Sequence, residues 1–209
     1  MSRTITRLFD NYTDATTALG ALEQLGVPHS DISIVANNAH GEHGGNGDKD
    51  GIDDVNDHGD VSRGVSTGAA LGGVGGLLAG LGLLAIPGLG PIVAAGWLVS
   101  TAVGAGIGAA GGAATGGIVG ALKNAGHSDD EANVYAEGVR RGGTLLSARV
   151  DDALLPQAEA VLNGNGSTDA TARGSAYRQE GWAAFDTDAP AFDRDKIDEE
   201  RKRYGPPLV

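Results

Sequence analysis

The sequence predicts an α+β protein in which a glycine-rich helical hairpin is inserted between two soluble halves. Three observations carry this prediction. Residues 1–36 show a strand–helix–strand pattern, and residues 123–163 show a helix–strand–helix pattern. From Gly64 to Leu122 the chain has no Asp, Glu, Lys, Arg or His. Within that stretch glycine recurs at every fourth residue, which is typical of closely packed helices.

The first half begins with β-forming, alternating residues from Thr4 to Phe9, which predict a strand. Asn11 is a favourable N-cap for the helix that follows, and Gly26 ends that helix. Residues 31–36 predict a second short strand. The helix has an apolar face at spacings of three and four, made of Ala15, Ala18, Leu19, Leu22 and Leu25.

Residues 37–63 form a polar segment with almost nothing to bury, so we expect a flexible acidic loop. Three histidines, His40, His43 and His58, lie among its aspartates and suggest a weak divalent-cation site. The run from Asp48 to Asp53 is similar to a calcium loop, but its glycine is misplaced and the closing glutamate is missing. A solvated loop is therefore favoured, and no metal ligand is assigned.

The hairpin is predicted from two runs of small residues on either side of a breaker at residues 87–91. Residues four apart lie on one helix face, so each run leaves a groove into which another backbone fits. We expect helices at roughly 65–86 and 92–122. The glycine zipper comprises Gly64, Gly68, Gly72, Gly76 and Gly80 before the turn, and Gly96, Ser100, Gly104, Gly108, Gly112, Gly116 and Gly120 after it.

The second half opens with a capping box, in which Ser128 is the N-cap and Glu131 occupies the third helical position. The helix is expected to reach about Arg141, before two glycines. Residues 144–150 predict a strand, and residues 151–162 predict a helix with Leu154, Leu155, Ala158 and Val161 facing inward.

Residues 164–209 are expected to form a polar linker, to Ser175, and a tail that ends in a charged helix over 195–204. The tail holds five of the nine aromatic residues. Tyr177, Trp182 and Phe185 are candidate anchors for a protein partner, because aromatic side chains are frequent at binding hot spots. The equally weighted alternative is that Trp182 and Phe185 cover this protein's own sheet.

Both soluble pieces carry motifs that resemble the bacterial general stress protein 17M-like domain, a family related to low-temperature-induced and heat-induced stress proteins. The motifs are Phe9-Asp10-Asn11-Tyr12 and Asp31-Ile32-Ser33-Ile34-Val35 in the first half, and Glu137-Gly138-Val139-Arg140-Arg141-Gly142-Gly143-Thr144-Leu145-Leu146 in the second. The tail segment 177–182 is also similar to a recurring ending of such proteins. The resemblance implies a ferredoxin-like sandwich and a stress-linked role. It supplies no catalytic residues.

The amino-acid composition argues against several classes of function for this protein. A net charge of −12 without a basic patch argues against nucleic-acid binding. The chain has no cysteine, and no lysine lies where a phosphate-binding loop would need one. Arg140 and Arg141 suggest an anion site, but a helix C-terminus has the wrong dipole for it. We therefore expect no enzyme, no cofactor and no metal.

The sequence is compatible with two locations for the predicted hairpin, a membrane or a soluble oligomer. Both helices reach the roughly 20 residues that span a bilayer, but the second exceeds the membrane thickness and its Ala/Gly half favours helix–helix contacts. Our leading hypothesis is a non-enzymatic stress protein that forms homo-oligomers and associates with the cytoplasmic face of the inner membrane through the zipper. The alternative is a cytoplasmic, oligomeric regulator that binds a small ligand or metal ion.

Overall fold

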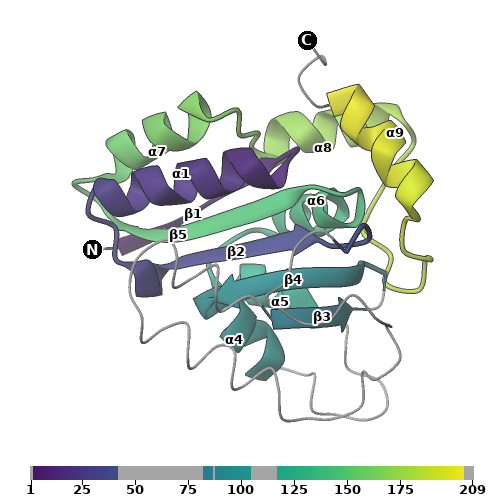
Figure 1. The fold of residues 1–209 in the computed structure, drawn as a ribbon, viewed down its shortest axis with the longest axis horizontal. Helices are drawn as coiled ribbons and strands as arrows, with labels where there is room; N and C mark the ends of the chain where they lie inside the picture. Colours follow the sequence, from purple (N-terminus) through teal and green to yellow (C-terminus); the bar gives the residue numbers. More distant parts are fainter. Residues whose placement is uncertain (1, 42–81, 87, 105–116, 205–209) are drawn as a thin grey trace.

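The computed structural model describes residues 2–41, 82–86, 88–104 and 117–204 of the chain. These residues form one five-stranded antiparallel sheet with α-helices packed around it (Figure 1). In chain order the elements are β1 (Ser2–Phe9), α1 (Tyr12–Gln24), η1 (His29–Asp31), β2 (Ile32–Asn37), β3 (Gly82–Ile86), β4 (Gly90–Gly96), α4 (Trp97–Gly104), α5 (Gly117–Asn124), α6 (Asp129–Arg140), β5 (Thr144–Asp151), α7 (Leu155–Gly164), α8 (Ala170–Gln179) and α9 (Arg194–Tyr204). The predicted α+β class is confirmed.

The strand order is β1-β5-β2-β4-β3, so β1 and β2 are separated by β5, whereas the hairpin strands β3 and β4 are adjacent. β5 lies between β1 and β2 and is antiparallel to both, with Leu146 opposite Arg7 on one side and Ile34 on the other. Therefore β1 and β2 run in the same direction and α1 connects them. The soluble halves thus assemble into one sheet, because β5 comes from the second half and both its neighbours come from the first.

Two apolar cores lie on opposite faces of the sheet because successive strand residues point to opposite sides. In β2, Ile34 packs in the core beneath α1 and α7, whereas Val35 packs in the core that α4, α5, α6 and α8 cover. Figure 1 shows α1 and α7 side by side on one side of the sheet. A two-layer sandwich has helices on one face only, so the finer ferredoxin-like prediction is not confirmed.

Local sequence signals account for the ends of the helices in both halves. The Asn11 side chain caps α1 by accepting from the backbone N–H of Asp14, at 2.8 Å. Gly26 follows α1 with a φ of 99°, in the left-handed region where glycine is unstrained. At α6 the predicted capping box is present, since Ser128 and Glu131 each accept from the other's backbone N–H. These predictions are confirmed.

The predicted helices are wrong at residues 82–86 and 92–96, which form strands β3 and β4 instead. The breaker does make a hairpin turn, with positive φ at Gly88 and Gly90, but it joins strands. β4 pairs antiparallel with β2, with Val93 opposite Ala36. The physical reason is that short apolar runs with β-branched residues fit a buried strand as well as a buried helix, and a free edge of β2 selects the strand.

A second correction concerns the expected linker before Ser175. Thr168 makes an isolated antiparallel bridge to Leu8 at the edge of β1, and Asp169 caps α8 by accepting from the N–H of Ala172. The linker is therefore partly a helix, because Asp169 supplies an N-cap and Tyr177 supplies an apolar anchor. The helix expected over 151–162 begins later, at Leu155, with Ala158 and Leu162 buried.

Candidate functional site

The three zipper glycines in the described part of the chain lie in three different elements. Gly96 ends β4, where its φ of 95° and the close approach of the Ile32 carbonyl oxygen leave room for hydrogen only. Gly104 ends α4, whereas Gly120 lies in α5, where an added Cβ would meet no atom within 4 Å. The other predicted members, Gly64, Gly68, Gly72, Gly76, Gly80, Gly108, Gly112 and Gly116, lie outside the described residues.

The three candidate anchors are mainly packing residues. Tyr177 is only 1% exposed, so its ring is part of the core rather than of the surface. Its ring makes edge contacts with those of Trp182 and Tyr204, at centroid distances of 5.8 and 6.0 Å. Trp182 and Phe185 pack half-buried against the same core as α6. These side chains cover the protein's own core.

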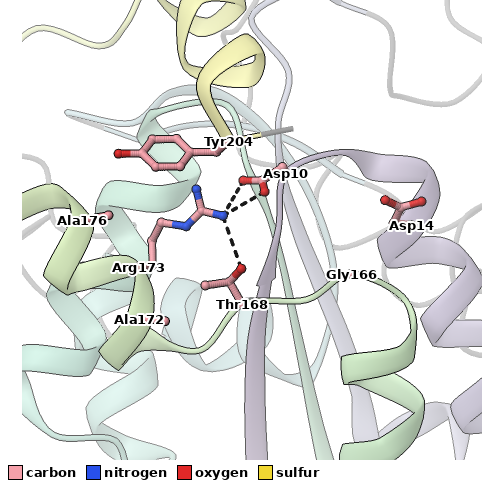
Figure 2. A pocket seen from close by; sticks show the side chains of 8 residues that line it. All are labelled: Asp10, Asp14, Gly166, Thr168, Ala172, Arg173, Ala176 and Tyr204. Atoms are coloured by element: carbon pink, nitrogen blue, oxygen red, sulfur yellow. Dashed lines mark hydrogen bonds and ion pairs between the residues drawn. The ribbon is translucent and has the colours of Figure 1, made fainter. Parts of the chain in front are cut away.

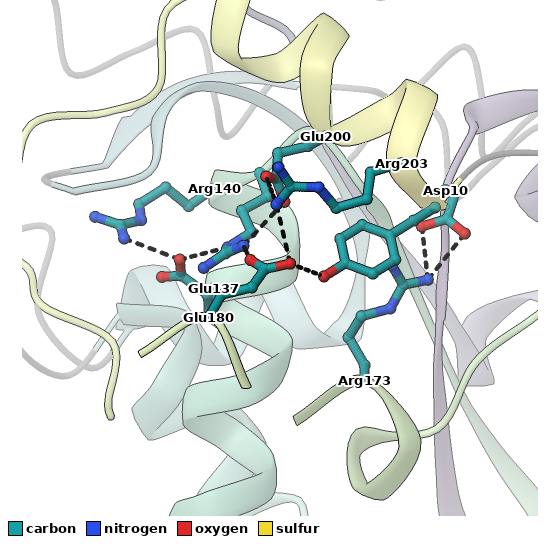
Figure 3. Close-up of polar contacts among 9 residues, drawn as sticks. Asp10, Glu137, Arg140, Arg173, Glu180, Glu200 and Arg203 are labelled. Atoms are coloured by element: carbon teal, nitrogen blue, oxygen red, sulfur yellow. Dashed lines mark hydrogen bonds and ion pairs between the residues drawn. The ribbon is translucent and has the colours of Figure 1, made fainter. Parts of the chain in front are cut away.

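An arginine–glutamate network joins the C-terminal end of α6 to α8 and α9 (Figure 3). Arg141 donates from Nε to Glu137 at 2.8 Å, and from Nη1 to Glu180 at 2.8 Å and to Glu200 at 2.9 Å. Arg140 donates to the same oxygen of Glu137, at 2.9 Å. Both arginines that suggested an anion site therefore hold the protein's own carboxylates.

Burial and hydrogen bonding shift the pKa values in this network. Burial by itself would lower the pKa of Arg141, but hydrogen bonds to Glu137, Glu180 and Glu200 outweigh it and raise that pKa well above the usual range. For Glu180, burial acts to raise the pKa, but hydrogen bonds from Tyr204 and Arg141 leave it below the ordinary value. Arg141 also lies 4.1 Å from the centroid of the Tyr177 ring. The network therefore fixes α9 to the domain.

A hollow of about 460 Å³ adjoins this network, where the end of β1 meets α8 and α9 (Figure 2). Its charged lining residues are Asp10, Asp14 and Arg173. Arg173 is 4% exposed and donates from Nη2 to both oxygens of Asp10, at 2.7 and 2.8 Å. Burial raises the pKa of Asp10 despite this pairing. Thr168 and Tyr204 complete the polar wall. Its volume lies within the range of small-molecule sites.

Sequence reasoning did not find this hollow. Arg173 lies in the segment expected to be a linker, and its partner Asp10 is 163 positions away in the chain. The only signal was Asp10 itself, which stands directly after a strand in a motif quoted for the family resemblance. No spacing rule connects two such distant residues.

A second polar cluster, of Thr6, His127, Ser147 and Glu131, resembles a catalytic triad in composition but not in geometry. The hydroxyl of Thr6 lies 2.7 Å from Nε2 of His127 and 3.0 Å from the hydroxyl of Ser147. Glu131 is 3.7 Å from Nδ1 of His127, beyond hydrogen-bond distance, and serves the capping box instead. Burial lowers the pKa of His127. Thr6 is 1% exposed, and the cluster lies at a second hollow of about 400 Å³ that Thr6, His127 and Glu131 help to line.

Within the described ranges no group of three or more potential ligands can hold a metal ion. His40, one of the three loop histidines, pairs with Asp198 of α9, at 3.2 Å from Nε2 to Oδ1. His43 and His58 lie outside those ranges. Likewise, none of the described helices has the length and apolar character needed to cross a membrane.

Comparisons with protein-family models, with curated proteins and with solved structures find no match to this chain. The fold and the hollow therefore define the protein as an α+β domain with an internally paired polar site. The resemblance to general stress proteins stays a prediction.

Proposed function

We propose that this chain is a non-enzymatic, stress-associated protein that self-assembles through its charge-free stretch and associates there with the cytoplasmic face of the inner membrane. The observation that supports self-assembly is the position of that stretch in the fold. Its described parts are β3 and β4, which form one edge of the sheet, and α4 and α5, which pack against each other (Figure 1). The ion-pair network of α6, α8 and α9 lies elsewhere.

The pairing of the candidate catalytic groups among the described residues also fits a non-catalytic role. The Thr6 hydroxyl that contacts His127 is buried, and Arg141 is engaged by three carboxylates. We retain the glycine zipper and the ferredoxin-like relationship only as predictions. The zipper now concerns residues outside 82–96, since strands occupy that region.

Replacing Gly108 and Gly112 together by leucine should dissociate the oligomers, because two large side chains would fill the groove that close helix packing requires. We would measure sedimentation velocity and the fraction retained in carbonate-washed membranes. The matched control is Gly164→Leu in α7, where an added Cβ meets no atom within 4 Å. Unchanged sedimentation and membrane retention of the double variant would refute the proposal.

The hollow beside Arg173 favours a second candidate function, a cytoplasmic regulator that binds a small ligand. Asp10 and Arg173 offer an acceptor and a donor within one cavity of suitable size. We would screen divalent cations and nucleotides by thermal unfolding. A specific ligand at 100 times its Kd stabilises the fold by about 2.7 kcal/mol, which raises Tm by roughly 5–10 °C. Arg173→Gln should abolish that shift; an equal shift in the variant argues against this site.

A further inference from the structure

We propose that β3 is the edge at which a second copy of this chain pairs, so that two sheets join across a two-fold axis. The inference rests on the proposed self-assembly and names the surface that carries it. β3 stands last in the strand order, and β4 is its only strand partner in the described part of the chain. Its outer backbone groups therefore form a template for another strand.

The side chains of β3 suit such pairing. The strand runs from Gly82 to Ile86 without a charged or polar residue. Leu83 is 61% exposed and is the exposed large hydrophobic residue of the described chain. An apolar edge strand without charged residues invites pairing with another strand, and this strand has that composition.

The opposite edge of the sheet, formed by β1, shows how an edge strand of this protein is protected. On β1, Leu8 exchanges two backbone hydrogen bonds with Thr168, at 2.9 and 2.8 Å, which closes one end of that edge. The remainder carries Arg3 and Arg7, and Arg3 forms an ion pair with Asp152 at 3.0 Å. Charged side chains and a covering segment are the usual protections of an edge strand. β3 has neither of them among the described residues.

The distribution of charge favours a second copy of this chain as the partner of β3. The chain carries a net charge of −12, so two copies repel each other at most of their surface. Residues 82–104, which surround β3, contain no charged residue. Antiparallel pairing of β3 with itself places neutral residues opposite neutral residues, and it brings Leu83 of each copy beside apolar residues of the other.

A peptide from another protein fits this edge less well. Strand-addition sites obtain specificity from pockets that receive alternate side chains of the added peptide. The apolar cavity behind β3, lined by Leu84, Ile86 and Ile118 among others, has a volume of only about 20 Å³. That space does not receive a side chain, so pairing at β3 must come from backbone bonds and from covering Leu83.

The absence of cysteine from the chain allows a direct test by chemical cross-linking. We would compare Leu83→Cys with the matched control Ser2→Cys, an exposed residue on the protected edge of β1. A short bismaleimide should convert most of the Leu83→Cys protein to covalent dimer at micromolar concentration, and little of the control. Equal cross-linking of the two variants overturns the inference.

The second test is the Leu83→Lys variant. A lysine on each copy places like charges at the β3–β3 interface, so the sedimentation coefficient should fall to that of a smaller species. Circular dichroism should be unchanged, since Leu83 is exposed. If Leu83→Lys leaves the assembly intact while the Gly108 and Gly112 variant dissolves it, the edge inference is wrong and zipper assembly stands. If the unmodified chain is monomeric, both are wrong.

Discussion

Arg141→Ala is expected to lower the free energy of unfolding by about 3 kcal/mol. The substitution removes a shared partner of three carboxylates. Glu180 and Glu200 keep Arg203, but Glu137, whose side chain is 0% exposed, keeps only Arg140 among the described residues. Removing one member of a buried pair costs about 3–5 kcal/mol, because an uncompensated charge is left in the interior. We expect the lower end of this free-energy range because Arg140 still donates to Glu137, at 2.9 Å.

The appropriate control is Arg3→Ala, which breaks the exposed ion pair to Asp152 and should change stability by about 1 kcal/mol or less. Urea unfolding of both variants gives the two free energies. Hydrogen exchange should also show faster exchange in α9, since Glu200 loses its bond to Arg141. If the two variants are equally stable, the network contributes little and α9 is held by Ile197 and Tyr204 instead.

Gly96→Ala is expected to destabilise the protein by about 2–5 kcal/mol. A residue with a side chain is strained at a φ of 95°, by about 1–2 kcal/mol, and overpacking adds about 1–3 kcal/mol. The added Cβ would overlap the carbonyl oxygen of Ile32 and stand 2.7 Å from Cα of Ser33. These are backbone atoms of β2, which cannot move without breaking the pairing with β4.

Gly120→Ala makes the matched comparison, because both glycines belong to the predicted zipper. In α5 an added Cβ meets no atom within 4 Å, and alanine in a helix is favoured over glycine by about 0.5–1 kcal/mol. The two substitutions should therefore change the urea midpoint in opposite directions. If residue 96 were inside a helix, both would be stabilising, so a stabilising Gly96→Ala would contradict the β-hairpin.

The α+β class and the soluble halves could be predicted because their signals are local. Asn11 and Ser128 cap helices by bonds to residues three positions away, and Gly26 provides a left-handed termination. The hollow could not be predicted, because Arg173 is paired with a residue from the other end of the chain. The same holds for Arg141, whose partners Glu180 and Glu200 lie on a later turn and helix.

By itself the sequence determined which segments carry charge, where the capped helices begin and where the chain turns. It also determined that residues 64–122 bring no charge to the fold. Only the tertiary structure decided that residues 82–86 and 90–96 are strands, that Tyr177 is buried and that β5 lies between β1 and β2. The physical reason is that caps and turns depend on neighbours along the chain. An apolar run without polar alternation depends instead on the surface that receives it, here the open edge of β2.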